Sequence, residues 1–245
     1  MATALRLATS LAQSRWESMA ENSGFPKRTI LCYGDSNVWG FVPGSNVERY
    51  PPAVRWTGVL ARLLGNSIRV LEEGLRGRSA ISDDPIVSAN GIECNGFKTL
   101  GAILGSHAPL DLVVIMLGTY DLRRSTRLSA YDIADGVAAL ANQARNIRFG
   151  PGSAEPPEVM VICPPPIWEM NSGFALRFRG GRETSEELRP AFRRMALSNN
   201  LPVIYAEDSL QSDPADGINF SPAGHAALGE AVASWILEQS SLVTC

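Results

Sequence analysis

Short β-rich runs alternate with helical patterns along most of the chain, and this alternation limits the folds that the sequence can adopt. The β-rich runs lie at residues 29–33, 67–71, 111–117, 158–163 and 202–205. The helical patterns lie at about 54–64, 96–105, 130–148, 183–199 and 222–239. Strands that alternate with helices predict βαβ units and a five-stranded parallel sheet with helices on both faces. The nearly continuous apolar run Leu110–Leu117 is typical of a central strand that is buried on both faces.

One domain is expected over residues 27–245, because no internal repeat, low-complexity linker or break in composition divides them. The 245 residues, 45% of them hydrophobic, are sufficient for a sizeable core. Residues 1–26 are expected to form an N-terminal extension, in which apolar side chains from Leu5 to Trp16 fit one face of a short docking or frayed helix. Arg6 interrupts the apolar core that a signal peptide needs, and a transit peptide is the weaker alternative.

Charge and cysteine usage exclude several classes of function. The net charge of −3 gives no electrostatic footprint for nucleic acid or for an anionic membrane. No apolar run approaches the roughly 18 residues that a membrane span needs. The four cysteines form no Cys-x-x-Cys pair and only two histidines exist, so a metal site is not expected. Cys32 and Cys163 are interpreted as buried small hydrophobes, and the expected compartment is the reducing cytoplasm.

Four polar segments follow predicted strands or precede the last helix. They are Gly34-Asp35-Ser36, Glu72–Ser79, Gly118–Asp121 and Asp216–Asn219. The carboxyl ends of neighbouring parallel strands converge, so these segments are expected to share one cleft. Gly34 permits a sharp turn that presents the Ser36 hydroxyl at the strand end. Taken alone, Gly-Asp-Ser is more typical of an ordinary strand-to-helix turn with a capping residue.

These segments resemble those of the SGNH (GDSL-like) hydrolases, and in particular the branch of arylesterases and acyltransferases. The resemblance covers roughly Arg28 to Leu237. It is carried by Gly34-Asp35-Ser36-Asn37-Val38-Trp39-Gly40, Val54–Leu60, Glu72-Glu73-Gly74-Leu75, Leu110–Thr119 and Pro164-Pro165-Pro166. It implies a flavodoxin-like three-layer α/β/α fold, and attack by a serine on the ester or thioester of a small-molecule substrate through an acyl-enzyme. It implies no cofactor, and relatives of this branch often assemble, which favours a homo-oligomer.

The resemblance also implies a role for individual residues. Ser36 matches the nucleophile, and its own backbone N–H would be one oxyanion donor. Gly77 matches the second backbone donor, and Asp216 matches the acid that orients a catalytic histidine. In such a triad a base takes the serine proton, an acid fixes the base, and the donors receive the developing oxyanion.

Two positions depart from the family pattern. The third family block, Gly-x-Asn-Asp, is Gly118-Thr119-Tyr120-Asp121 here, and the fourth, Asp-x-x-His, is Asp216-Gly217-Ile218-Asn219. Asn219 is neutral and cannot accept the proton of Ser36. Losing the histidine of a serine triad costs on the order of 10⁶ in turnover. Losing one oxyanion donor costs roughly 10²–10³, although the two losses do not simply add.

Tyr120 has two interpretations of equal weight: its phenol donates to a reacting oxygen, or its ring fills the pocket. Asp121 and Asp35 are expected to fix their loops through backbone hydrogen bonds rather than to act as catalysts. His225 is expected to be structural or capping, and His107 to lie away from the cleft.

Aromatic and basic side chains near these segments are less specific signals. Trp39 and Trp168 are candidates to line an apolar pocket, whereas Trp56 is expected in the core. Arg76 and Arg78 are candidates to meet an anionic group, although solvated arginines are the default expectation.

Three functional hypotheses remain open. The first is an enzyme on this scaffold that has left ester hydrolysis for lyase, isomerase or cyclase chemistry, with Asp216 acting as acid or base. The second is a residual serine esterase or acyltransferase in which His225 or water assists Ser36. The third is a non-catalytic binding or assembly protein. Deliberate inactivation is a less attractive explanation, because two separate blocks are changed.

Overall fold

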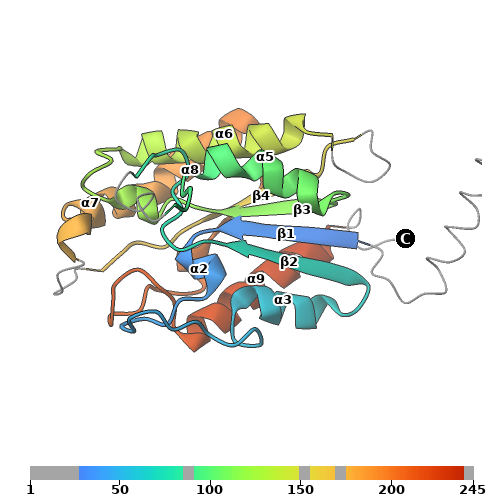
Figure 1. Cartoon of the computed structure of the whole chain (residues 1–245), viewed down its shortest axis with the longest axis horizontal. Coiled ribbons are helices and arrows are strands. Elements are labelled where there is room, and N and C mark those ends of the chain that lie inside the picture. The colour runs from blue at the N-terminus through green and yellow to red at the C-terminus, as the bar shows by residue number, and fades with distance from the viewer. Residues whose placement is uncertain (1–27, 85–90, 149–154, 169–174, 240–245) are drawn as a thin grey trace, which may run out of the picture.

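The computed structural model describes residues 28–84, 91–148, 155–168 and 175–239. Its centre is a parallel sheet of five strands in the order β2-β1-β3-β4-β5 (Figure 1). The strands are β1 Arg28–Gly34, β2 Ile68–Gly74, β3 Leu112–Met116, β4 Glu158–Cys163 and β5 Val203–Tyr205. This sheet confirms the predicted flavodoxin-like α/β fold, and all five strands occur where the β-rich runs are.

Helices cover both faces of the sheet, as Figure 1 shows. One face carries α5 (Gly96–His107), α6 (Ala130–Asn146) and α8 (Leu188–Asn199). The other carries α3 (Trp56–Leu64) and α9 (Pro222–Glu238). β3 is buried along its whole length and its side chains alternate between the two cores, so the prediction of a central strand is confirmed. Cys32 and Cys163 are buried as expected.

Capping residues explain where the longer helices begin. Ser129 forms a capping box with Asp132 at the start of α6, and the Ser221 side chain accepts from the Gly224 N–H at the start of α9. Each cap satisfies backbone donors that the first helical turn leaves unpaired. Pro222 occupies the first turn of α9, where its missing N–H costs nothing.

Two predicted boundaries differ from the structure. The single helix expected at 183–199 is two helices, α7 (Gly181–Glu186) and α8, with a break at Glu187. Pro190 explains the break, because a proline has no N–H to donate to the carbonyl four residues earlier. β2 is longer than predicted, since Glu72 and Glu73 belong to the strand and not to the segment after it. Glutamate is uncommon in strands, so the β-rich pattern in the sequence ended at residue 71, before Glu72 and Glu73.

The carboxyl ends of the first three strands meet at one edge of the sheet. In the strand register Gly34 pairs with both Gly74 and Met116. A side-chain carbon on Gly74 would lie 2.1 Å from the Trp39 backbone nitrogen. Only glycine therefore lets the short helix α2 (Ser36–Trp39) approach the end of β2 this closely.

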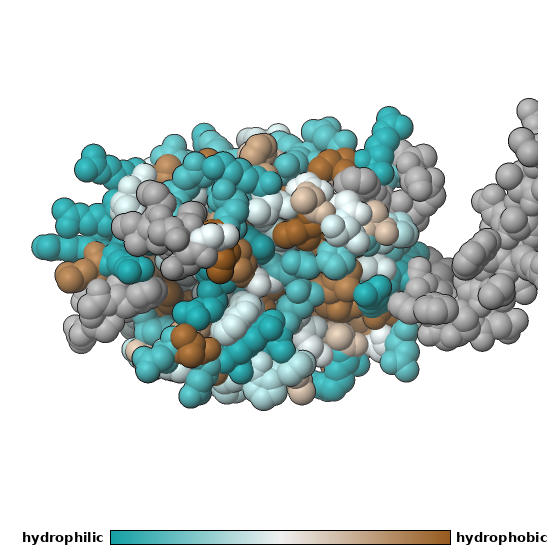
Figure 2. Space-filling view, in the orientation of Figure 1, coloured by the Kyte–Doolittle hydropathy of each residue, from teal (hydrophilic) through white to brown (hydrophobic). Residues whose placement is uncertain are grey.

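The surface and the chain termini leave several predictions open. On the face drawn in Figure 2, hydrophilic side chains dominate and apolar ones lie in small separate groups. Within the described residues, no helix is long and apolar enough to cross the bilayer, and no group of three or more side chains is suited to hold a metal ion. Residues 1–26 lie outside the described residues, so the N-terminal extension stays a prediction. The homo-oligomer and the cytoplasmic location also stay predictions.

Candidate active site

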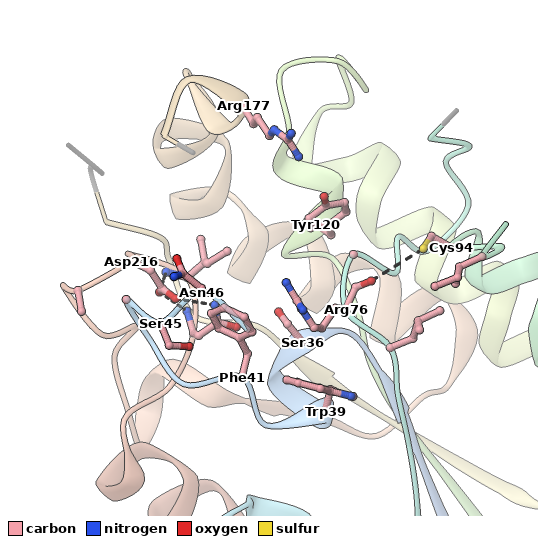
Figure 3. Close-up of a pocket in the computed structure, with 17 residues that line it drawn as sticks. Ser36, Trp39, Phe41, Ser45, Asn46, Arg76, Cys94, Tyr120, Arg177 and Asp216 are labelled. Atoms are coloured by element: carbon pink, nitrogen blue, oxygen red, sulfur yellow. Dashed lines mark hydrogen bonds between the residues drawn. The ribbon is translucent and has the colours of Figure 1, made fainter. Parts of the chain in front are cut away.

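A cavity of about 740 Å³ opens at the edge where the strands end (Figure 3). Its wall comes from the segments that follow β1 and β2, from the turn after β3, and from the loop before α9. The lining residues are Ser36, Trp39, Phe41, Gly44, Ser45, Asn46, Leu75, Arg76, Gly77, Ile92, Cys94, Tyr120, Arg177, Ala215, Asp216, Ile218 and Asn219. The four polar segments identified in the sequence therefore each contribute to one cavity, as expected.

Ser36 is the first residue of α2 and is half-buried at the cavity wall. The Asp35 carboxylate caps α2 by accepting from the Asn37 N–H at 2.9 Å. The Asn37 side chain in turn donates to the Ile218 carbonyl at 3.0 Å. This bond ties the serine-bearing helix to the Asp216–Asn219 loop, although the two segments lie far apart in the sequence.

The Asp216 carboxylate is an acceptor for its own loop. Its Oδ1 accepts from the N–H groups of Ile218 and Asn219 at 3.0 and 2.9 Å. Its Oδ2 accepts from Nδ2 of Asn219 at 2.7 Å. Asn219 is buried, and among the described residues its Oδ1 has no hydrogen-bond partner. Asp216 therefore holds the neutral amide of Asn219 in the cavity wall that also contains Ser36.

The turn after β2 brings Gly77 to the cavity with φ of 80°, a conformation that favours glycine. Arg78, next to it, is buried and donates to the carbonyls of Gly34 (2.9 Å) and Glu73. Its guanidinium carbon lies 4.1 Å from the centroid of the Tyr33 ring. The default expectation of a solvated arginine is therefore wrong for Arg78, which fastens the Gly77 turn to the ends of β1 and β2.

Tyr120 lies in a short 3-10 helix after β3 and is 8% exposed. Its ring packs edge-on against Phe178, with 5.9 Å between centroids, and the Arg123 guanidinium lies 4.0 Å over the ring. Arg123 also donates to the Tyr120 carbonyl at 2.8 Å and pairs with Asp84. The tyrosine is thus held as part of the cavity wall.

Two buried carboxylates lie beneath this wall. The Asp121 oxygens accept from the Ala80 N–H at 2.8 and 3.1 Å, which joins the turn after β3 to the loop after β2. Burial raises the pKa of Asp121 to about 7, against the opposing effects of the Ala80 N–H and Arg123. Burial likewise raises the pKa of Asp35 to about 6. Neither carboxylate lines the cavity, so both hold loops in position.

Both histidines lie outside the cavity wall. His225 is fully buried in α9, and its Nδ1 accepts from the Trp56 N–H at 3.3 Å, at the start of α3. Burial, with a smaller effect of Arg55, lowers the pKa of His225 to about 4. His107 ends α5 and bonds to Glu73, with 2.6 Å between Nε2 and Oε1. His225 caps a helix, in agreement with its expected structural role.

Among the candidate tryptophans Trp39, Trp56 and Trp168, it is Trp39 that lines the cavity. Trp56 is buried in the core, as expected. Trp168 is 42% exposed and borders a separate surface pocket with Arg189, so the structure does not bring it to this site.

A family model described as "GDSL-like Lipase/Acylhydrolase family" matches residues 32–227, which is most of the chain. The chain belongs to the GDSL-like lipase/acylhydrolase family. A search of curated proteins finds no match to it.

Solved structures of esterases are similar to this family member along nearly their whole length. A carbohydrate acetylesterase from Sinorhizobium meliloti is 38% identical, with a TM-score of 0.81, and the match covers 86% of this chain and 99% of that one. The native aryl esterase of M. smegmatis is 40% identical, with a TM-score of 0.80 and the same coverage. A putative arylesterase from Agrobacterium tumefaciens is 31% identical, with a TM-score of 0.76, covering 86% and 99%.

Several cavity residues of this family member were missed by sequence reasoning. Arg177 comes from a 3-10 helix (Ala175–Phe178) outside any family block, and no local pattern places it at the site. Cys94 and Ile92 come from the loop before α5. Phe41, Ser45 and Asn46 follow α2, and a loop directly after the Gly-Asp-Ser segment was the available signal for them.

Proposed function

We propose that the cavity beside Ser36 binds a small ester, and that Ser36 is not activated by a serine–histidine–aspartate triad. The observation that carries this proposal is the bond from Asn219 Nδ2 to Asp216 Oδ2, at 2.7 Å. In a triad the residue bonded to the acid takes up the serine proton. An amide has no useful basicity near neutral pH, so Asn219 supplies hydrogen bonds without accepting that proton.

The ester as ligand class is supported by the family and by the cavity. The family consists of lipases and acylhydrolases, and the similar structures carry the names aryl esterase and carbohydrate acetylesterase. The cavity wall contains a serine, and the backbone N–H groups of Ser36 and Gly77 are proposed to receive the carbonyl oxygen.

The hypothesis of a substitute base has little support. His225 lies in the core with Nδ1 bonded to the Trp56 N–H, and His107 bonds to Glu73. The Asp216 carboxylate already accepts three hydrogen bonds from its own loop. Both of its oxygens are therefore engaged by that loop. We therefore infer that Ser36 turns over esters slowly at best.

Acid–base chemistry other than hydrolysis is the second candidate, and one observation favours it. The Tyr120 side chain stands in the cavity wall, with its ring fixed by Phe178 and Arg123. A phenol held in this way is suited to donate a proton to a bound substrate. Lyase, isomerase or cyclase chemistry would then depend on Tyr120 and not on Ser36.

Hydrolysis of 4-nitrophenyl acetate by the full chain, Ser36→Ala and Asn219→His tests the proposal. We expect the parent and Ser36→Ala to match at background, and Asn219→His to gain hydrolysis that a second change, Ser36→Ala, removes. Tyr120→Phe is the control for the second candidate function, acid–base chemistry at Tyr120, because it removes the phenol hydroxyl and leaves Ser36 intact. Parent activity well above background that Ser36→Ala abolishes would show that a base exists and that the proposal is wrong.

A further inference from the structure

Two arginine side chains reach the cavity from distant parts of the chain. Arg76 comes from the turn after β2, and Arg177 from the 3-10 helix Ala175–Phe178. Figure 3 shows both side chains pointing into the cavity, with Tyr120 between them and the end of Arg76 directed toward Ser36. A ligand at Ser36 would therefore lie close to a guanidinium group.

Arg76 is positioned by the aromatic rings beside it. Its guanidinium carbon lies 4.9 Å from the centroid of Phe41 and 5.5 Å from that of Trp39. A guanidinium is attracted to the face of an aromatic ring, and its N–H donors lie at the edge of its own plane. Within the described residues, no carboxylate forms an ion pair with Arg76. A planar anion such as a carboxylate fits this edge through two parallel hydrogen bonds.

The charge of the cavity wall is opposite to that of the whole chain. The chain carries a net charge of −3. Among the described lining residues, Arg76 and Arg177 are positive and Asp216 alone is negative. The Asp216 oxygens accept from Ile218 and Asn219, so this carboxylate is directed to its own loop. The described part of the wall therefore presents Arg76, which forms no ion pair with a described carboxylate, to an anion.

We propose that the ligand is an ester that also carries a free carboxylate, such as a half-ester of a small dicarboxylic acid. This inference rests on the proposed function and names its substrate class. Arg76 binds the carboxylate, while the ester carbonyl lies at Ser36, and Arg177 lines the cavity on the other side of Tyr120.

Calorimetric titration of the full chain with monomethyl succinate and with dimethyl succinate tests this inference, because the two esters differ mainly by one negative charge. We expect the half-ester to bind at least about fivefold more tightly at low salt, as a charge-assisted contact implies. Raising the salt concentration should narrow this preference, since the arginines are partly exposed to solvent. Arg76→Gln should remove most of the preference, and Arg177→Gln should reduce it.

Arg62→Gln is the matched control, because Arg62 is an exposed arginine of α3 outside the cavity wall. Equal binding of the two esters, unchanged in Arg76→Gln, would overturn this inference and leave the proposed function intact. A loss of preference in Arg62→Gln as large as in Arg76→Gln would also overturn it, because the effect would then be one of overall charge. Binding of neither ester would overturn the proposed function as well.

Discussion

The side-chain amide of Asn219 donates to the Asp216 carboxylate, with 2.7 Å between Nδ2 and Oδ2. The same carboxylate accepts from the Asn219 backbone N–H at 2.9 Å, so the acid fixes both the main chain and the side chain of this residue. An imidazole at this position would be oriented in the same way, and this geometry makes Asn219→His a direct test of what the site lacks.

Replacing Tyr120 by asparagine should add to the effect of Asn219→His on ester hydrolysis. In the Asn219→His background, Tyr120→Asn is expected to raise kcat for a small aryl ester by about 10²-fold, because an amide there would donate to the oxyanion. Steady-state kinetics with 4-nitrophenyl acetate provide the measurement. Tyr120→Phe is the control, since it removes the hydroxyl without adding an amide donor. An equal gain from Tyr120→Phe would show that removal of the hydroxyl, and not the added amide donor, raises kcat.

Sequence reasoning was sufficient for the sheet because its signals are local. A run such as Leu112–Met116 is apolar throughout, and a buried parallel strand requires that. The same local signals placed Ser36, Gly77 and Tyr120 after strand ends and Asp216 before the last helix, and the fold brings these positions together.

The remaining features depend on contacts that no local pattern encodes. Arg78 looks like any loop arginine in sequence, and its burial follows from the Gly34 and Glu73 carbonyls that converge on it. Arg177 reaches the cavity because the 3-10 helix Ala175–Phe178 packs beside Tyr120, with Phe178 edge-on against the tyrosine ring. Long-range placement of this kind is set by tertiary packing and not by propensity.

The buried carboxylate of Asp121 should make stability depend on pH. Burial raises its pKa from 3.8 to about 7, so between these values the folded chain holds a proton that the unfolded chain has lost. The contribution of Asp121 to the free energy of unfolding therefore falls as the pH rises from about 4 to about 7, by an amount on the order of 2–4 kcal/mol. Asp121→Asn imitates the protonated form, keeps an acceptor for the Ala80 N–H, and should reduce this fall.

Urea denaturation of the parent and Asp121→Asn at pH 5 and pH 8 measures the effect. Asp135→Asn is the matched control, because Asp135 lies on the surface of α6, where it pairs with Arg194. A difference in unfolding free energy between the parent and Asp121→Asn that is the same at pH 5 and at pH 8 would contradict the prediction.

His225 should affect stability with the opposite dependence on pH. Its pKa is lowered by burial from 6.5 to about 4, so in this window the unfolded chain binds a proton that the folded chain does not. The stabilisation is present above pH 6.5 and is lost as the pH falls toward 4. His225→Ala also removes the acceptor of the Trp56 N–H, and it should destabilise the chain at pH 7.5 by about 1–3 kcal/mol.

The dependence on pH separates this structural role from a catalytic one. Urea denaturation should show a larger difference in unfolding free energy between the parent and His225→Ala at pH 7.5 than at pH 5, because the group that takes up the proton in the unfolded chain is absent from the variant. His107→Ala is the control, since His107 bonds to Glu73 at a partly exposed site.

Ester hydrolysis by Asn219→His should persist when His225→Asn is added, because the asparagine oxygen can still accept from the Trp56 N–H and keep α3 capped. Loss of that hydrolysis in a folded His225→Asn variant would instead place His225 in the proton path to Ser36, through a movement of α9 that opens the core.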